Sequence, residues 1–437
     1  MKSMNSVQEI VERNRRYVFH GGRGWEAPII FVGGEGCIVN DISGKEYIDC
    51  FSGCAGPLFI GWKHPRVVEA IKRHAEFPHS MWAFINIQRV ELAEKLARIA
   101  PLGLNKTWFG SNGGDAVENA IKGAMLFTGK KEVISLYNAY HGQTIAMLGL
   151  MQPAIREGLP PIPGFRQIPP AYCYRCFYGQ TYPGCDFECA RALEAMIKYG
   201  SYNDVAAFII EPVQGSGGHV YPPDEEYSKI IMETCEKHDV VIIADEVQTG
   251  LGRTGKMWGC ECIGLQPDIM CLGKPLGGGL PISATIFREE LAEKIVPKLW
   301  AGMTHSGGPL VCAAASATLD VIVGEKAPEK ASKMGDFMTQ RLKAMWEEHD
   351  LIGDVRGPGL FIGVELVKDR QTKEKATDEA LKTARMCLER GVWVGTSQQP
   401  GIGNVIKIKP AFVITEEQAS KALSVLDSVL TYIEKES

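Results

Sequence analysis

The sequence predicts an α/β protein: a large domain with a mostly parallel central sheet between helices, plus a smaller α+β domain. With 437 residues, the chain is too long for one small core. From about residue 105 to 325, short apolar runs alternate with stretches of helical period. From about residue 330 this alternation gives way to longer helical stretches. Two packed domains therefore follow from the length and the pattern.

The expected strands of the large domain are apolar runs, and their polar residues come at the carboxyl ends, where open α/β sheets bind ligands. These runs cover residues 131–137, 205–213, 240–247 and 268–274. The smaller domain is expected to contain helices over 329–346 and 378–391, a strand over 359–367 and a last helix opened by a Thr415/Gln418 capping box. We expect residues 1–60 to pack with this domain (329–437), and residues 61–328 to form the large one.

Composition narrows the classes of function. Charged residues make up 23% of the chain, hydrophobic residues 45%, and the net charge is −5, so neither nucleic acid nor an anionic membrane is an expected partner. The first 19 residues carry charges throughout and hold no continuous apolar stretch, so no secretory signal or membrane anchor is expected. The 13 cysteines, an odd number scattered along the chain, favour reduced thiols. These observations predict a cytoplasmic enzyme.

Lys274 is the first candidate for chemistry, because it ends an apolar run and precedes a glycine-rich loop. Burial lowers the pKa of a lysine toward the range in which its amine is a nucleophile, which suits imine formation. The alternative is a surface lysine lying over a strand end. Asp245 and Glu246 end another apolar run and must point to opposite faces, so one of them faces the same edge as Lys274. A carboxylate there can keep a pyridine nitrogen protonated.

Gly113 and Gly114 separate a strand-like run from a helix, and Tyr140 follows the run over 131–137. Free backbone N–H groups at a helix start attract a phosphate, although such glycines often serve only a tight turn. Tyr140 can stack on a flat ring, although an aromatic at a strand end is more often part of a core. Lysine, acid, phosphate seat and aromatic together are much less expected from packing alone.

These motifs resemble those of the class III (omega-) aminotransferases, which are fold-type-I pyridoxal-phosphate-dependent enzymes. The resemblance runs over nearly the whole chain, through the segments SNGGDAVENAIK, YHG, IIEPVQGSGG, IIADEVQTGLGRTGKMW, LGKPLGGGLPISA and THSGGPLVCAAAS in the family's order. It implies pyridoxal 5'-phosphate as cofactor. It also implies amino-group transfer from an amine or amino acid donor to a keto acid.

Carried over by position, the resemblance implies a role for each of several residues. Lys274 forms the Schiff base and moves a proton at the substrate, and Asp245 pairs with the pyridine nitrogen. Val247 and Tyr140 lie on the two faces of the ring, and Gln248 reaches its phenolic oxygen. The remaining positions implied to contact the cofactor or line its site are Gly113 and Gly114 at the phosphate, His141, and Glu211, for which a strand-end acid is the alternative.

Thr304 is implied to reach the phosphate of a neighbouring subunit. That contact implies a homodimer with active sites at the interface, or a tetramer built from such dimers.

The sequence departs from the family pattern at Lys407, where members often carry an arginine that binds the substrate carboxylate. An ammonium attracts a carboxylate as a point charge but cannot form the planar two-bond contact. A lysine-held acid and a substrate without a carboxylate are both compatible with this residue. So is diversion to racemisation or epimerisation of an amino acid or amino-lactam, or less favourably to a decarboxylase or lyase reaction. Transamination is the function predicted.

Cys173, Cys176, Cys185 and Cys189 fall within seventeen residues of a Tyr/Pro/Gly-rich stretch. Four thiols at this spacing are compatible with a structural zinc, and the alternative is a loop of reduced or transiently oxidised cysteines. We expect no metal in the active site and a stabilising role for this stretch.

Other classes of function fit less well. A P-loop enzyme needs a lysine just after its glycines, and Asp115 stands there. The early GGEG stretch is followed by no helix-like run, which argues against a dinucleotide fold. A catalytically silent binding protein is expected to lose Lys274 or Asp245, and both are present.

Overall fold

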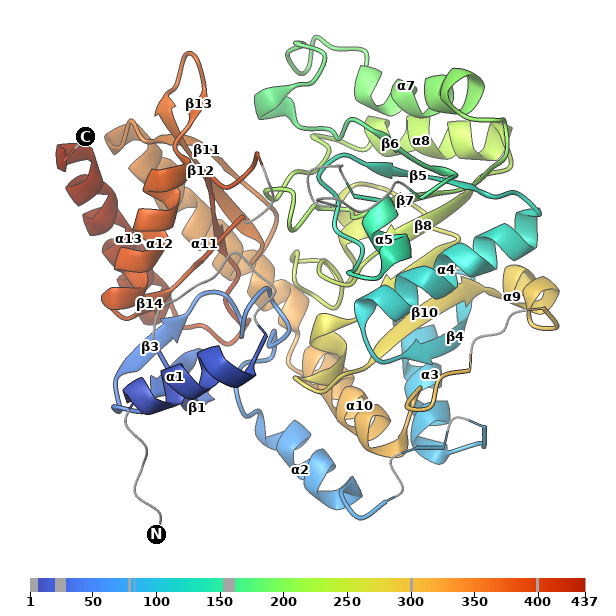
Figure 1. Ribbon diagram of the computed structural model, residues 1–437, viewed down its shortest axis with the longest axis horizontal. Coiled ribbons are helices and arrows are strands. Elements are labelled where there is room, and N and C mark those ends of the chain that lie inside the picture. Colours follow the sequence, from blue (N-terminus) through green and yellow to red (C-terminus); the bar gives the residue numbers. More distant parts are fainter. Residues whose placement is uncertain are drawn as a thin grey trace.

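The computed structural model describes residues 7–19, 29–77, 80–81, 83–151, 162–298, 302–397 and 401–436. A seven-stranded sheet in the order β4-β10-β9-β8-β7-β5-β6 lies at its centre (Figure 1). The strands are β4 Leu104–Gly110, β5 Glu132–Leu136, β6 Phe165–Ile168, β7 Val205–Ile210, β8 Val241–Asp245, β9 Ile269–Leu272 and β10 Ser283–Arg288. Strands β6, β5, β7, β8 and β9 pair in parallel, and β10 is antiparallel to β9 and β4. The sheet is mostly parallel, as predicted.

Alternate residues of the central strands pack on opposite faces of this sheet, so both faces must be covered. On one face Ile209 and Ile243 lie in the core that includes α4 Gly113–Thr128 and α9 Glu289–Ile295. On the other face Phe208 and Ile242 lie in the core that includes α7 Glu188–Ala195 and α8 Glu226–Lys237. Every residue of β5, β7, β8 and β9 is buried. The continuous apolar runs of the sequence are therefore strands between two helical layers.

Two smaller sheets join the beginning and the end of the chain. One has the order β1-β2-β3-β14 and the other the order β11-β12-β16-β15, with β13 paired to β12. Their strands are β1 Phe31–Glu35, β2 Ile38–Asp41, β3 Glu46–Asp49, β11 Ile352–Arg356, β12 Ile362–Asp369, β13 Glu374–Lys375, β14 Val392–Trp393, β15 Gly395–Thr396 and β16 Val405–Ile408. Strand β14 pairs in parallel with β3. Residues near the N-terminus thus complete a sheet with residues from the C-terminal part, while the domain boundaries at 60 and 328 stay predictions.

The remaining helices link the sheets and cover them. They are α1 Val7–Tyr17, α2 Pro65–His74, α3 Ile87–Ile99, α5 Ile145–Gly149, α10 Pro309–Gly324, α11 Ala327–Glu348, α12 Thr377–Glu389 and α13 Glu416–Glu436, with short turns η1 Cys173–Arg175, η2 Met196–Gly200, η3 Gly259–Cys262 and η4 Lys274–Gly277. Figure 1 shows α11, α12 and α13 gathered beside β11 and β12, away from the central sheet. The predicted capping box is confirmed, because Thr415 and Gln418 each accept the backbone N–H of the other at 3.1 Å.

The cysteine-rich stretch leaves the central sheet after β6 and contacts the C-terminal sheet. Its four cysteines, like the other nine of the chain, are free thiols. Within the described residues no three His, Cys, Asp or Glu side chains are placed to hold a metal ion. All four cysteines lie in the described part of the chain. This geometry therefore does not support the zinc site that their spacing suggested.

Glu365 on β12 holds this stretch by buried hydrogen bonds. Its side chain is fully buried and accepts from the Tyr172 hydroxyl, from Arg175 Nε at 2.5 Å and from Asn404 Nδ2 at 3.2 Å, and Arg356 NH1 lies 2.7 Å from Oε2. Burial opposes ionisation, but Arg356, Tyr172 and Arg175 together outweigh it and lower the pKa of Glu365. One carboxylate therefore binds the cysteine-rich stretch to the C-terminal sheet.

We predict that Glu365→Gln lowers the free energy of unfolding at neutral pH by about 3 kcal/mol, because it leaves Arg175 without its charge partner and Arg356 with Asp354 alone. The folded pKa of Glu365 is below the usual 4.5, so its contribution is present above that value and is lost as pH falls. Urea unfolding at several pH values measures both effects. The control is Glu374→Gln, which removes an exposed pair with Lys368 and is expected to cost less than about 1 kcal/mol. Equal effects of the two substitutions at neutral pH would contradict the prediction.

Candidate active site

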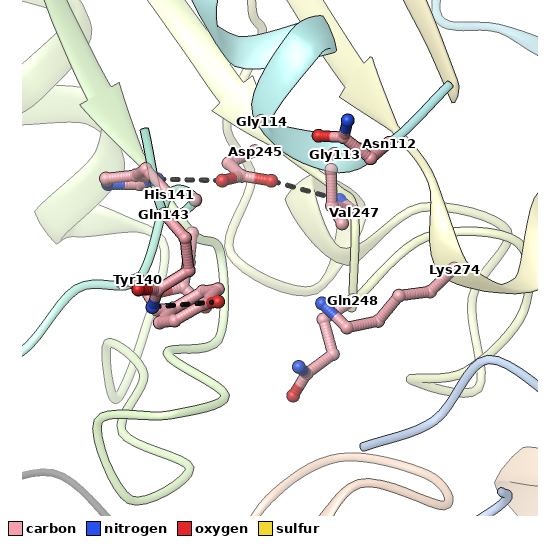
Figure 2. Close-up of a pocket in the computed structure, with 12 residues that line it drawn as sticks. Asn112, Gly113, Gly114, Tyr140, His141, Gln143, Asp245, Val247, Gln248 and Lys274 are labelled. Atoms are coloured by element: carbon pink, nitrogen blue, oxygen red, sulfur yellow. Dashed lines mark hydrogen bonds and ion pairs between the residues drawn. The ribbon is translucent and has the colours of Figure 1, made fainter. Parts of the chain in front are cut away.

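A cavity of about 240 Å³ lies at the carboxyl ends of the central strands (Figure 2). It is lined by Asn112, Gly113, Gly114, Tyr140, His141, Gly142, Gln143, Glu211, Asp245, Val247, Gln248 and Lys274. The residues come from the segments that follow β4, β5, β7, β8 and β9. Because the parallel strands end at one edge, residues more than 150 positions apart in the sequence reach a single cavity.

Lys274 enters the cavity from the turn that follows β9. Its φ of +33° is unusual for a residue with a side chain, and such strained backbone tends to occur at functional sites. Burial lowers the pKa of the Lys274 amine, and the charges of Asp245 and Glu211 oppose that shift. Figure 2 shows the lysine side chain extending across the cavity toward the other lining residues. The amine is therefore placed and tuned as a nucleophile requires.

Asp245 is held from two sides at the end of β8. Its Oδ2 lies 2.7 Å from His141 Nδ1, and its Oδ1 accepts the Val247 N–H at 3.1 Å. Both side chains are buried. The adjacent Glu246 turns away and accepts from the Thr249 hydroxyl and from the backbone N–H groups of Gly259 and Cys260. Of the two acids at this strand end, Asp245 faces the cavity and Glu246 caps a turn.

The start of α4 offers backbone donors to an anion. Asn112 and Asp115 form a capping box, which uses the N–H groups of Ser111, Asn112 and Asp115. The N–H groups of Gly113 and Gly114, the first two residues of the helix, have no partner in the described part of the chain. A Cβ at Gly113 would lie 2.8 Å from Val247 Cγ1, so only glycine fits there. A phosphate is the ligand that such a helix start suits.

Glu211, at the end of β7, ties Tyr140 to the loop after its own strand. Its Oε1 accepts the Tyr140 N–H at 2.8 Å, and its Oε2 accepts the Gly215 N–H at 3.0 Å. Burial raises the pKa of Glu211. The Tyr140 hydroxyl in turn accepts from Gln143 Nε2 at 3.2 Å. Glu211 thus fixes the backbone from which Tyr140 projects.

Lys407 and Thr304 are the two predicted site residues that do not line this cavity. Lys407 is buried on β16, and burial lowers its pKa to about 8, with Glu211 opposing the shift and Lys274 adding to it. The Lys407 amine is therefore close enough to the cavity for the charges of Glu211 and Lys274 to change its pKa. Thr304 lies in the turn before α10, where its carbonyl accepts from Ser80 Oγ at 2.5 Å. Its predicted contact with a neighbouring subunit stays a prediction.

Sequence reasoning missed several residues at this site. Asn112 and Gln143 line the cavity, and Lys409 contacts Gln248. Lys409 carried a usable signal, because it stands two positions after Lys407 and shares its side of an extended segment. Asn112 carried another, since it directly precedes the helix that begins with two glycines.

Comparison with known proteins gives a consistent result. The family described as "Aminotransferase class-III" matches residues 22–430. The leucine/methionine racemase of Thermococcus litoralis is 38% identical over 433 residues, which cover 98% of this chain and 96% of the relative. The acetylornithine aminotransferase of Methanothermobacter thermautotrophicus is 36% identical over 427 residues, which cover 97% of this chain and 99% of the relative. The solved structure of a transaminase from directed evolution by ancestral reconstruction has a TM-score of 0.92 at 28% identity and covers 99% of this chain and 100% of that one.

The comparisons also confirm the predicted fold class. In the described part of the chain, every helix is too short or too polar to cross a bilayer.

We predict that Asp245→Asn lowers the pKa of Lys274 further, because the Asp245 charge opposes the effect of burial. In cofactor-free protein, the pH at half-maximal labelling of Lys274 by pyridoxal 5'-phosphate and borohydride should move down, as mapped by mass spectrometry of peptides. Asp268→Asn is the matched control, because Asp268 directly precedes β9, the strand that leads to Lys274, and is not among the causes of the shift in the Lys274 pKa. An upward movement, or an equal one in the control, would refute the prediction.

Proposed function

Because the chain belongs to the class III aminotransferase family, whose members depend on pyridoxal 5'-phosphate, we propose that it moves an amino group from an amine or amino acid to a keto acid. One observation carries this proposal. The amine of Lys274 and the carboxylate of Asp245 reach the same cavity from the ends of the neighbouring strands β9 and β8. We further propose that the protein acts in the cytoplasm.

The residues around the cavity suit the cofactor. When bound, pyridoxal 5'-phosphate supplies an aldehyde that condenses with amines and a ring that accepts the electron pair released at the substrate carbon. Gly113 and Gly114 would donate backbone N–H groups to its phosphate, and Asp245 would accept a hydrogen bond from its protonated ring nitrogen. Val247 and Tyr140 would lie on its two faces, and Gln248 would donate to its phenolic oxygen.

His141 acts through Asp245. Its contact at 2.7 Å orients the carboxylate, while its Nε2 has no partner in the described chain. The polar contacts of His141 in the described chain are thus directed at Asp245.

Lys274 carries the proton transfers. Burial lowers its pKa, which favours the neutral amine more than in an exposed lysine. The neutral amine takes a proton from the substrate carbon beside the amino group and returns it elsewhere. Glu211 and Asp245 keep the ammonium form accessible, because both carboxylates favour the charged lysine.

Lys407 is the proposed contact for a substrate carboxylate. It is buried near Glu211 and Lys274, and no hydrogen bond within the described chain satisfies its amine. An ammonium there attracts a carboxylate through charge alone, with less control over orientation than an arginine provides.

Racemisation or epimerisation of an amino acid is the second candidate. The lysine at position 407 favours it, because a loosely oriented substrate can be protonated on either face. A leucine/methionine racemase is among the relatives of comparable similarity. The two reactions share the removal of the proton and differ in the atom and face to which it returns. A lyase outcome has no comparable support in the site.

A homodimer is proposed from an exposed apolar surface near Thr304. The two segments joined by the Ser80–Thr304 hydrogen bond carry several exposed apolar side chains, with exposed fractions from 39% to 86%: Phe77, Phe84, Ile85, Ile87, Val90 and Met303. Exposed apolar side chains that gather in one patch mark protein interfaces. Thr304 stands beside Met303, so a second copy seated there would bring Thr304 close to a neighbouring active site.

Lys274→Ala should abolish the absorbance band of the imine near the visible edge and lower activity by about 10²–10⁴-fold, because both the covalent link and the proton carrier are lost. The band is measured after incubation with pyridoxal 5'-phosphate, and Lys407→Ala serves as the matched control that keeps the band. A wild-type protein that stays colourless with excess cofactor would count against the whole proposal.

The two candidate reactions separate in deuterated water. A transaminase should consume a keto acid in proportion to the amino donor and form a new amino acid. Deuterium exchange with inversion of the donor, in the absence of keto acid consumption, would instead establish racemisation. Chiral chromatography with mass spectrometry measures both products in one experiment.

A further inference from the structure

Lys409 is a buried lysine that the proposed chemistry leaves without a role. It directly follows β16, and its side chain is among the largest that are fully buried in the protein. Its Nζ donates to Gln248 Oε1 at 3.0 Å. The same Nζ lies 5.1 Å from the ring centre of Phe51 and 5.2 Å from that of Phe361. No carboxylate of the described chain pairs with it.

Its electrostatic surroundings are unfavourable to a charge. Burial lowers the pKa of Lys409 well below its usual value, Lys407, Arg253 and Lys274 lower it further, and Cys54 opposes them. Two aromatic faces recover part of this cost but not all of it. The cost of keeping a lysine here indicates that its contact with Gln248 serves a purpose beyond packing.

The main chain holds Lys409 firmly in place. Its N–H donates to the Cys50 carbonyl at 2.7 Å, and its carbonyl accepts from Ser52 Oγ at 2.5 Å. Gly215 makes room for the Gln248 side chain, because a Cβ at this position would lie 1.9 Å from Oε1. The Gln248 oxygen therefore lies beside both Lys409 and Gly215.

A carboxamide has an accepting oxygen and a donating nitrogen. The oxygen of Gln248 accepts from Lys409 Nζ, so its Nε2 is left for the cavity. Figure 2 shows the amide of Gln248 with its nitrogen on the side of Asp245 and its oxygen on the far side. The reverse orientation would set the Nε2 hydrogens against the lysine.

We propose that Lys409 is a positioning residue that fixes the amide of Gln248, so that Nε2 donates into the cavity to an oxygen anion of the bound ligand. The inference rests on the proposed function, in which that anion is the phenolic oxygen of pyridoxal 5'-phosphate. Lys409 touches neither cofactor nor substrate and acts only through Gln248.

A double-mutant cycle tests this role. Lys409→Met keeps an unbranched side chain of similar length but has no donor. We expect it to weaken binding of pyridoxal 5'-phosphate to the cofactor-free protein by about threefold or more, and to raise the pH midpoint of the absorbance change of the holoenzyme. In a Gln248→Ala background the same substitution should change both quantities less, because the amide through which Lys409 acts is absent.

Two further variants control for charge and for folding. Lys407→Met removes the other buried lysine of this region, and its effect should be the same in the wild-type and Gln248→Ala backgrounds. Lys409→Gln keeps an N–H donor, so its cofactor affinity should stay within about twofold of wild type. Thermal unfolding of each cofactor-free variant shows that it is folded, and Lys409→Gln carries the test if the methionine variant is not.

The outcomes separate the two proposals. An equal effect of the Lys409 substitution in both backgrounds, or a glutamine variant as impaired as the methionine one, would overturn the positioning role. A wild-type protein without cofactor affinity or absorbance band would instead overturn the proposed function.

Discussion

The strand ends at β8 and β9 are the constraint on which the rest of the site depends. A carboxylate and an amine meet there because two parallel neighbours end at one edge, and burial lowers the pKa of the Lys274 amine. Asp245 is then steadied by His141, and Glu211 by the backbone of Tyr140 and Gly215. The helix α4 adds its donors at the same edge. The sheet therefore determines where the site residues lie, and the segments after the strands provide the groups that contact one another.

The region between the cavity and the C-terminal sheet is rich in buried cations. Lys274, Lys407, Lys409 and Arg253 lie within electrostatic reach of one another, and few carboxylates balance them. A folded protein tolerates such an excess only where each cation has another source of stabilisation. Arg253 donates to the carbonyl groups of Leu360 and Pro410, and Lys409 has an amide and two rings. An anionic ligand would relieve this imbalance, which agrees with a site for a phosphorylated cofactor and an acidic substrate.

Much of this could be predicted from the sequence, because it depends on local pattern. Apolar runs ending in Asp245 and Lys274 indicate strands and their edge, and two glycines before a helical stretch indicate an anion seat. Contacts between distant segments leave no such signal. Glu365 meets Tyr172 and Arg175 across almost two hundred positions, and nothing around it distinguishes it from a surface acid. Strand β10, which is antiparallel to both of its neighbours, was not predicted either. Neither was the contact of Lys409 with Gln248.

The pairing of β3 with β14 has a consequence for synthesis of the chain. Ile48 pairs with Val392, and Cys50 accepts from Lys409, so the outer edge of β3 emerges from the ribosome long before its partners exist. Closing so large a loop is slow compared with forming the local helices. The segment that carries Lys409 and contacts Gln248 is thus added last, and a truncated nascent chain leaves the outer edge of β3 exposed to other newly made chains.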